Sequence, residues 1–178
     1  MYWKNVFPDY AVKQAFHEAK VERSDEHVIS VMQSDLVTRC VIGILRPAII
    51  HCINNKRKFI NEKDIEVGAS LTIFPSKKKP EGAGFLLDVT EFVTIIKEHI
   101  HLCIIQISKQ CPEIGLEKEY KLSHDTMMKL QMEVESCIRG FVAAIGPNVS
   151  FRQFEVTMGK ILGDPSYVLY DQGYIPYL

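Results

Sequence analysis

The chain has 178 residues, 47% of them hydrophobic, and a formal net charge of −1 at pH 7, so it can bury a core and is not generally disordered. Its longest apolar stretches are interrupted by charged residues, and neither a membrane span nor a secretory signal is expected. Five cysteines without CxxC spacing favour reduced core thiols and an intracellular location.

The first part of the chain predicts a short helix followed by a long one. Helical spacing of apolar residues places the short helix at residues 10–19, opened by Pro8. Ser24 is a suitable N-cap for the long helix, which continues to about Asn55. Pro47 lies inside this helix, and we expect a kink there because proline removes a backbone donor.

A basic loop at residues 56–60 separates the long helix from a third, short one. Asn61 is a suitable cap for this third helix, which runs through Leu71. Residues 75–84 (PSKKKPEGAG) then combine proline, glycine and lysine between apolar segments, which is typical of a linker. The sequence therefore divides into a first unit at 1–74, a linker at 75–84 and a second unit.

The second unit, at residues 85–163, repeats this order with less distinct boundaries. Residues 85–107 are apolar and helical, with room for an extra helix before the short one. Ser123 caps a long helix that ends at Gly146, and residues 153–162 form a final short helix. Residues 164–178 contain four tyrosines and little charge, so we expect this tail to dock on a surface.

The order of short, long and short helices with a basic segment before the third resembles the histone fold. A single trio cannot bury the apolar side of its long helix, so histone folds pair in an antiparallel handshake. Two copies on one chain, at residues 8–74 and 85–163, are similar to a histone doublet. The resemblance implies an all-α fold of two tandem histone folds in an intramolecular handshake.

Residues 56–66 (KRKFINEKDIE) carry the most specific part of this resemblance. They are similar to the second loop and third helix of the family, where an arginine pairs with an aspartate seven residues later. Arg57 and Asp64 hold those positions, so the resemblance implies a structural ion pair that fixes the loop against the third helix. Another interpretation is that the basic run is a solvated helix end that favours the helix dipole.

The second unit has its own likeness to the family. Residues 122–135 (LSHDTMMKLQMEVE) resemble the start of the long helix in histones of the third core class, and the first unit is most similar to the fourth class or to an archaeal histone. This order is similar to the fused histone doublets of some large DNA viruses. The second unit departs from the family where Pro147 and Asn148 replace the basic pair and Glu155 replaces the aspartate.

The charges are distributed unevenly between the two parts of the chain. Residues 1–80 carry 13 Lys and Arg against 9 Asp and Glu, whereas residues 81–178 carry 8 against 13, so an anionic partner would meet the first part more readily. The resemblance implies sequence-independent binding of double-stranded DNA through phosphates and the minor groove. The candidate DNA contacts are Arg23, Lys56, Arg57, Lys58, Lys77, Lys78, Lys79, Lys121 and Arg152.

The handshake implies how these contacts group. Because the second loop of one fold lies beside the first loop of the other, residues 56–58 would cluster with Lys121, and Arg23 would join Arg152. The linker lysines would add a mobile cationic patch.

The sequence carries no pattern of an active site. It has no Gly-rich phosphate loop, nucleophile elbow or zinc-ligand spacing. His99 and His101 are two residues apart and therefore lie on different faces of a helix, which disfavours joint metal ligation. We expect neither an enzyme nor a bound cofactor, metal, membrane or small-molecule substrate.

Three functions remain open at this point. The first is a DNA-compacting histone doublet that assembles with other histone-fold proteins or a second copy of itself, in the nucleus or, for a viral protein, in the viral factory and virion. The second is a histone-fold scaffold subunit of a transcription or chromatin complex, favoured by the near-neutral charge and the apolar tail. The third is an unrelated helical adaptor. The basic loop, the lysine-containing linker and the doublet arrangement favour the first.

Overall fold

The computed structural model describes residues 7–21, 26–33, 37–72, 74–110, 122–145 and 156. Six helices are found there: α1 (Asp9–Glu18), α2 (Glu26–Val31), α3 (Val37–Asn54), α4 (Glu62–Leu71), α5 (Val89–Gln110) and α6 (His124–Ile145). These ranges contain no β-strand, so the all-helical prediction is confirmed for them. Within the same ranges, no helix combines the length and apolarity that a membrane crossing requires.

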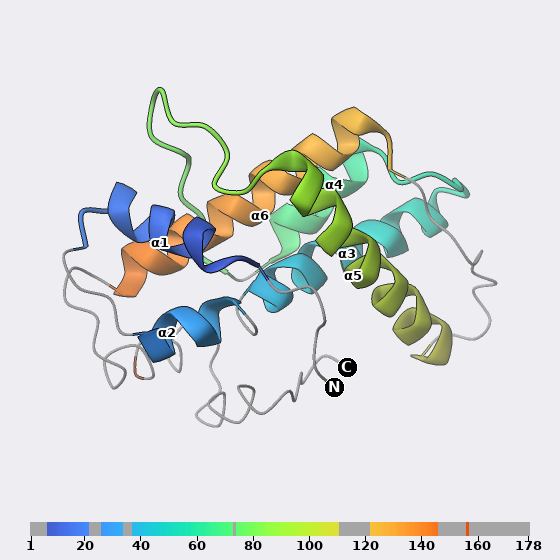
Figure 1. Ribbon diagram of the computed structural model, residues 1–178. Helices are drawn as coiled ribbons and strands as arrows, with labels where there is room; N and C mark the ends of the chain where they lie inside the picture. Colours follow the sequence, from blue (N-terminus) through green and yellow to red (C-terminus); the bar gives the residue numbers. More distant parts are fainter. Residues whose placement is uncertain are drawn as a thin grey trace.

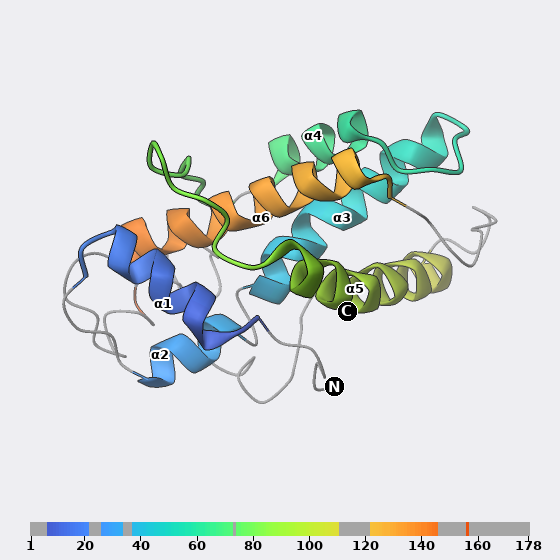
Figure 2. The same ribbon diagram turned by 45° about the horizontal axis from the view of Figure 1, so that its top comes forward.

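Helix α6 extends across the described body, with α1 at one end and α4 at the other (Figures 1 and 2). Three helices of the first half, α1, α3 and α4, pack against α6, and α5 of the second half packs against α3. One continuous apolar cluster includes Phe16 and Ile44 from the first half and Phe92 and Phe141 from the second. The two halves therefore bury their apolar surfaces against each other, at about 1.5–3 kcal/mol for each large side chain.

The helices of the first half lie close to their predicted positions. Helix α1 begins and ends one residue earlier than predicted, and α4 begins directly after Asn61. The predicted long helix is described as α2 and α3, and residues 34–36 between them lie outside the described residues. Pro47 lies inside α3, where the proline ring leaves one backbone carbonyl without its helical partner.

The second half differs from the expected order. Helix α5 has 22 residues, as many as α6, so the expectation of a short first helix in this half is wrong. It begins at Val89 because Asp88 caps it: the Thr90 backbone N–H donates to Asp88 Oδ1 at 2.9 Å. The predicted Ser123 cap of α6 is present, with Thr126 N–H donating to Ser123 Oγ at 3.2 Å.

Several sequence-based predictions concern parts of the chain outside the described residues. They are the end of the last long helix at Gly146, the final helix at 153–162 and the tail at 164–178. Within residues 146–178 the structure describes residue 156 alone, and that residue is helical.

Two glycines allow backbone segments to approach each other closely. A Cβ on Gly68 of α4 would lie 2.2 Å from the backbone oxygen of Ile44 in α3. A Cβ on Gly140 of α6 would lie 2.3 Å from the backbone oxygen of Pro75, at the start of the linker. Any larger residue at either position would have to push a backbone away, so these glycines set the spacing of α3 to α4 and of the linker to α6.

Candidate nucleic-acid interface

The basic loop begins with a tight ending of α3. The backbone N–H of Arg57 donates to the oxygen of Cys52 (3.1 Å), and that of Lys56 donates to the oxygen of Ile53 (2.9 Å), which together form a Schellman motif. Lys56 has a φ of 54°, in the left-handed region that costs a residue with a Cβ about 1 kcal/mol. The motif satisfies the last carbonyls of α3 and leaves the Lys56 side chain exposed.

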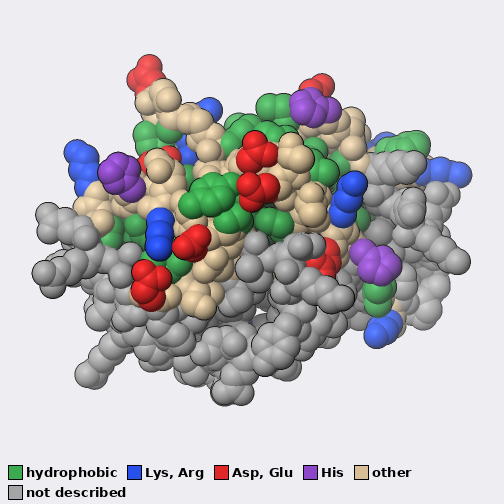
Figure 3. Space-filling model, in the orientation of Figure 1, with side chains coloured by type: hydrophobic (Ala, Val, Ile, Leu, Met, Phe, Trp, Pro, Cys, Tyr) green, Lys and Arg blue, Asp and Glu red, His purple; other side chains and the backbone are tan. Residues whose placement is uncertain are grey.

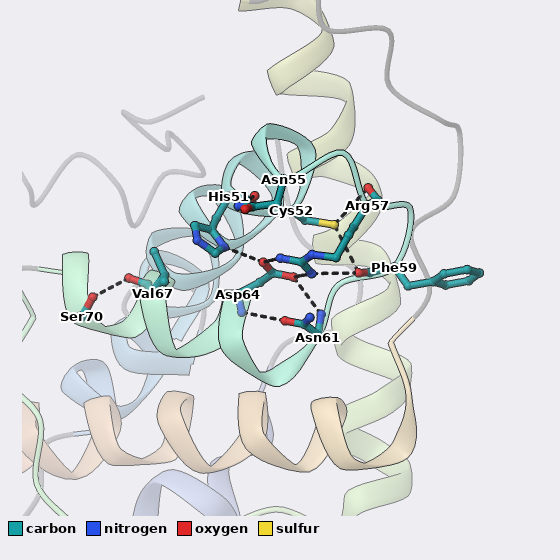
Figure 4. A network of polar contacts seen from close by, with 9 residues as sticks. All are labelled: His51, Cys52, Asn55, Arg57, Phe59, Asn61, Asp64, Val67 and Ser70. Atoms are coloured by element: carbon teal, nitrogen blue, oxygen red, sulfur yellow. Dashed lines mark hydrogen bonds and ion pairs between the residues drawn. The ribbon is translucent and has the colours of Figure 1, made fainter.

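The ion pair predicted from the sequence between Arg57 and Asp64 is present (Figure 4). Arg57 Nη1 donates to Asp64 Oδ2 at 2.6 Å, and Nη2 donates to Oδ1 at 2.5 Å, so the two planar groups meet through two parallel hydrogen bonds. The Asp64 side chain is 0% exposed, whereas that of Arg57 is 31% exposed. The guanidinium therefore covers the carboxylate from the solvent side and attaches the loop to the first turn of α4.

Asp64 is satisfied by more than its arginine. Its Oδ2 accepts the backbone N–H of Asn61 at 2.9 Å, while the Asn61 side chain accepts the backbone N–H of Asp64 at 3.1 Å, a reciprocal capping box. His51 Nδ1, from α3, lies 2.6 Å from Asp64 Oδ1. Burial acts to raise the pKa of Asp64, but the hydrogen bonds from Arg57, Asn61 and His51 outweigh it and lower the pKa below the ordinary value.

A buried thiol holds the other side of the loop. Cys52 Sγ donates to the backbone oxygens of Arg57 and Phe59, both at 3.3 Å. Burial and the nearby charge of Asp64 raise the pKa of Cys52, so the thiol keeps the proton that these two contacts need. Residues 57–59 are thus held by side chains from both α3 and α4.

The loop lies beside the beginning of α6. Ile60 forms an isolated parallel β-bridge with Leu122, two residues before the first residue of that helix. This bridge joins segments 62 residues apart in the sequence and places the basic loop of the first half against the residues that directly precede α6. Lys121 lies outside the described residues, so the expected grouping of residues 56–58 with Lys121 stays a prediction.

The candidate DNA contacts fall into three groups. The side chains of Lys56, Lys58, Lys77, Lys78 and Lys79 are exposed. Arg57 has both terminal nitrogens bound to Asp64, so its first role is structural. Arg23 and Arg152, like Lys121, lie outside the described residues, so the expected grouping of Arg23 with Arg152 stays a prediction.

The linker lysines lie far from the basic loop. The backbone N–H of Lys77 donates to the oxygen of Ser136 at 3.0 Å, and Arg139 Nη2 donates to the oxygen of Gly84 at 3.2 Å. Ser136 is twelve residues after His124, or roughly 18 Å along the helix. The linker is therefore attached to α6 at both ends, not free as expected, and its lysines form a second basic group beside α6 just past the middle of the helix.

A buried polar cluster fixes the chain where the linker enters the second half. Glu135 accepts the backbone N–H groups of Leu86 (2.6 Å) and Leu87 (3.2 Å), and Gln131 Nε2 donates to the oxygen of Leu87 (2.7 Å) and to Glu135 (2.9 Å). Burial raises the pKa of Glu135 against the opposing effects of these donors and of the Arg139 charge. Gln131 and Glu135, both within the segment 122–135 whose sequence resembles the histone family, therefore have a structural role here.

Sequence reasoning missed the ion pair that joins the two halves. Arg139 Nε and Nη2 donate to the Glu18 carboxylate at 2.8 and 3.2 Å, and both side chains are nearly buried. The partners are 121 residues apart, and neither stands in a motif. Only the crossing of α1 over α6 brings them together.

Among the described residues on the face seen in Figure 3, no single dense basic patch occurs. On that face the Lys and Arg side chains lie apart from one another, with Asp and Glu side chains between them. His99 is buried and His101 is exposed, on different faces of α5 as predicted, and no group of three potential metal ligands occurs among the described residues. The basic loop is the cationic element with the most defined geometry in the described part.

Comparison of the chain with known protein families, curated proteins and solved structures finds no match.

Proposed function

We propose that the chain is a histone-type doublet that binds double-stranded DNA without reading its sequence, with the loop at residues 56–60 as its main contact. The main observation that supports this proposal is that the conformation of the loop is fixed. The Arg57–Asp64 pair and the Cys52 thiol hold it beside the start of α6. A preformed loop loses little conformational entropy when exposed lysines meet phosphates.

The packing between the halves supports the doublet part of the proposal. In an intramolecular handshake, the long helices cross and each first helix packs on the long helix of the other half. Here α3 contacts α6, α1 packs on α6 and α5 packs on α3. The Ile60–Leu122 bridge adds the pairing of one half's second loop with the other half's first loop.

The charges limit how tightly DNA would be held. Two exposed lysines lie in the basic loop and three in the linker, and residues 81–178 are net acidic. With about two to five phosphate contacts, the logarithm of affinity should fall against the logarithm of salt with a slope of roughly −2 to −4.5. Binding of this kind is salt-sensitive and weaker than nucleosome-like wrapping on its own, so a second copy or other histone-fold proteins would complete a compacting particle.

The test is a titration of a mixed-sequence duplex of about 30 base pairs, followed by fluorescence anisotropy over a salt series. The double variant Lys56→Ala/Lys58→Ala should weaken binding and reduce the salt slope by about 1.8. Replacing Lys97 and Lys109, two exposed lysines of α5, by Ala is the matched control for lost charge and should change the slope little. If the unmodified protein fails to bind at low salt, alone and with co-expressed histone partners, the DNA proposal is refuted.

The second candidate function is a scaffold subunit that binds protein. Two large apolar side chains, Leu71 at the end of α4 and Met132 on α6, are exposed, and the second half is acidic. If the chain is such a scaffold, Leu71→Asp should abolish capture of a partner protein and leave the circular dichroism spectrum unchanged. Neither the original protein nor the variant should bind DNA.

A further inference from the structure

The basic loop presents an aromatic side chain to solvent. Phe59, between Lys58 and the bridging residue Ile60, is 64% exposed, although phenylalanine is usually buried in folded proteins. In Figure 4 its ring points away from the Asp64 network. Its neighbour Ile60 is buried and turns toward the core, so the alternation of the chain at this point directs Phe59 outward.

The backbone that carries this ring is fixed. The oxygen of Phe59 accepts from Cys52 Sγ at 3.3 Å and from Arg57 Nη1 at 3.5 Å, and the next residue is held by the bridge to Leu122. The ring is therefore offered from a rigid support and has only its own two torsions to lose on binding. That lowers the entropic cost of using it as a contact.

The surroundings indicate which partner such a ring fits. Lys56 and Lys58 are exposed on the same short loop, so a polyanion is drawn to the place where the ring projects. Apolar side chains on DNA-binding proteins enter the minor groove as wedges between base steps, and the energy of unstacking is recovered through added contacts. An apolar protein patch would not need the flanking cations.

We infer that Phe59 is an apolar wedge that enters the minor groove of the bound duplex and gives the protein a preference for DNA that is already distorted. The inference rests on the proposed DNA-binding function and adds to it a contact that is not electrostatic. Because an unpaired or bulged site requires less unstacking, the wedge should favour it over a uniform duplex.

The experiment compares the full chain with Phe59→Ala and Phe59→Leu on two duplexes of equal length, one uniform and one with a two-nucleotide bulge. Phe59→Ala should weaken binding to the bulged duplex about 5- to 30-fold and leave the salt slope unchanged, whereas Lys56→Ala/Lys58→Ala lowers the slope. Phe59→Leu, which keeps an apolar wedge, should stay within about threefold of the original. Leu71→Ala is the matched control, since Leu71 is equally exposed (65%) but at the end of α4.

The outcomes separate this inference from the proposed function. If the unmodified chain binds DNA, prefers the bulge and loses that preference in Phe59→Ala alone, the wedge is supported. If it binds both duplexes equally, or if Phe59→Ala binds as the original does, the wedge is wrong and the DNA proposal stands. If Phe59→Ala changes only self-association in sedimentation, the ring belongs to a protein interface and the inference is overturned.

Discussion

Replacing Arg57 by alanine tests the element on which the basic loop depends. The change removes the guanidinium that covers Asp64 and leaves a carboxylate that is 0% exposed. It deletes two charge-assisted hydrogen bonds, at 2.6 and 2.5 Å, between the loop and α4. The remaining donors to Asp64 are the backbone N–H of Asn61 and His51.

The expected cost follows from this geometry. Removing one partner of a fully buried ion pair costs about 3–5 kcal/mol, because the other charge is left without compensation. Arg57 is 31% exposed, so water can enter where it stood, and Asp64 keeps two contacts. We therefore expect Arg57→Ala to lower the free energy of unfolding by about 2–3 kcal/mol, with a fall in Tm of roughly 5–10 °C.

Urea unfolding at pH 7, followed by circular dichroism at 222 nm, measures this difference. Lys63→Ala is the matched control, since Lys63 is an exposed cation on α4 and should stay within about 0.5 kcal/mol of the original. In an Asp64→Asn background the same Arg57 change should cost at least about 1 kcal/mol less, because the charge it serves is gone. If Arg57→Ala and Lys63→Ala have the same free energy of unfolding, the Arg57–Asp64 pair does not stabilise the fold.

The pH dependence of this stability difference provides a second test of the ion pair. The pKa of Asp64 is lowered in the folded state from its ordinary 3.8, so its stabilisation is present above 3.8 and is lost as the pH falls through the folded value. The gap between the original protein and Arg57→Ala should therefore be full at pH 7 and narrow below about pH 4. A gap that widens on acidification would contradict this assignment.

Three further predictions concern stability. Burial lowers the pKa of His99 from 6.5 to about 4, so between these values the unfolded chain binds a proton there and the folded chain does not. The free energy of unfolding should therefore fall by about 2 kcal/mol from pH 7 to 5. In urea titrations at the two pH values, His99→Leu should remove this fall. Lys56→Gly relieves the left-handed backbone and should raise the unfolding free energy by up to about 1 kcal/mol in the same assay while weakening DNA binding; a loss of stability would show that the turn is not strained. Gly68→Ala drives a Cβ into the Ile44 backbone and should lower Tm by several degrees, whereas Gly43→Ala meets side chains, those of Phe74 and Thr72, and should cost less.

The local elements of this protein could be predicted because their signals are local. Asn61 and Ser123 are caps recognisable from their own side chains and the residues that follow, and both act as caps. Arg57 in the loop and Asp64 in the first turn of α4 are only seven residues apart, so the resemblance of this segment to the histone fold was sufficient to predict their ion pair. The basic loop and the linker were likewise evident from composition.

Other features were decided only when α1, α3 and α6 packed together. Glu135, 48 or 49 residues away, accepts the N–H groups of Leu86 and Leu87 and so fixes the segment that leads into the 22-residue α5. The Glu18–Arg139 pair and the attachment of the linker to Ser136 also join distant parts of the chain. The sequence by itself determined helices, caps and the loop, because short-range hydrogen bonds form wherever their donors and acceptors are neighbours. The tertiary structure decided which charged side chains are paired and which are exposed to solvent. Burial and ion pairs between distant segments form only when the two halves share one core.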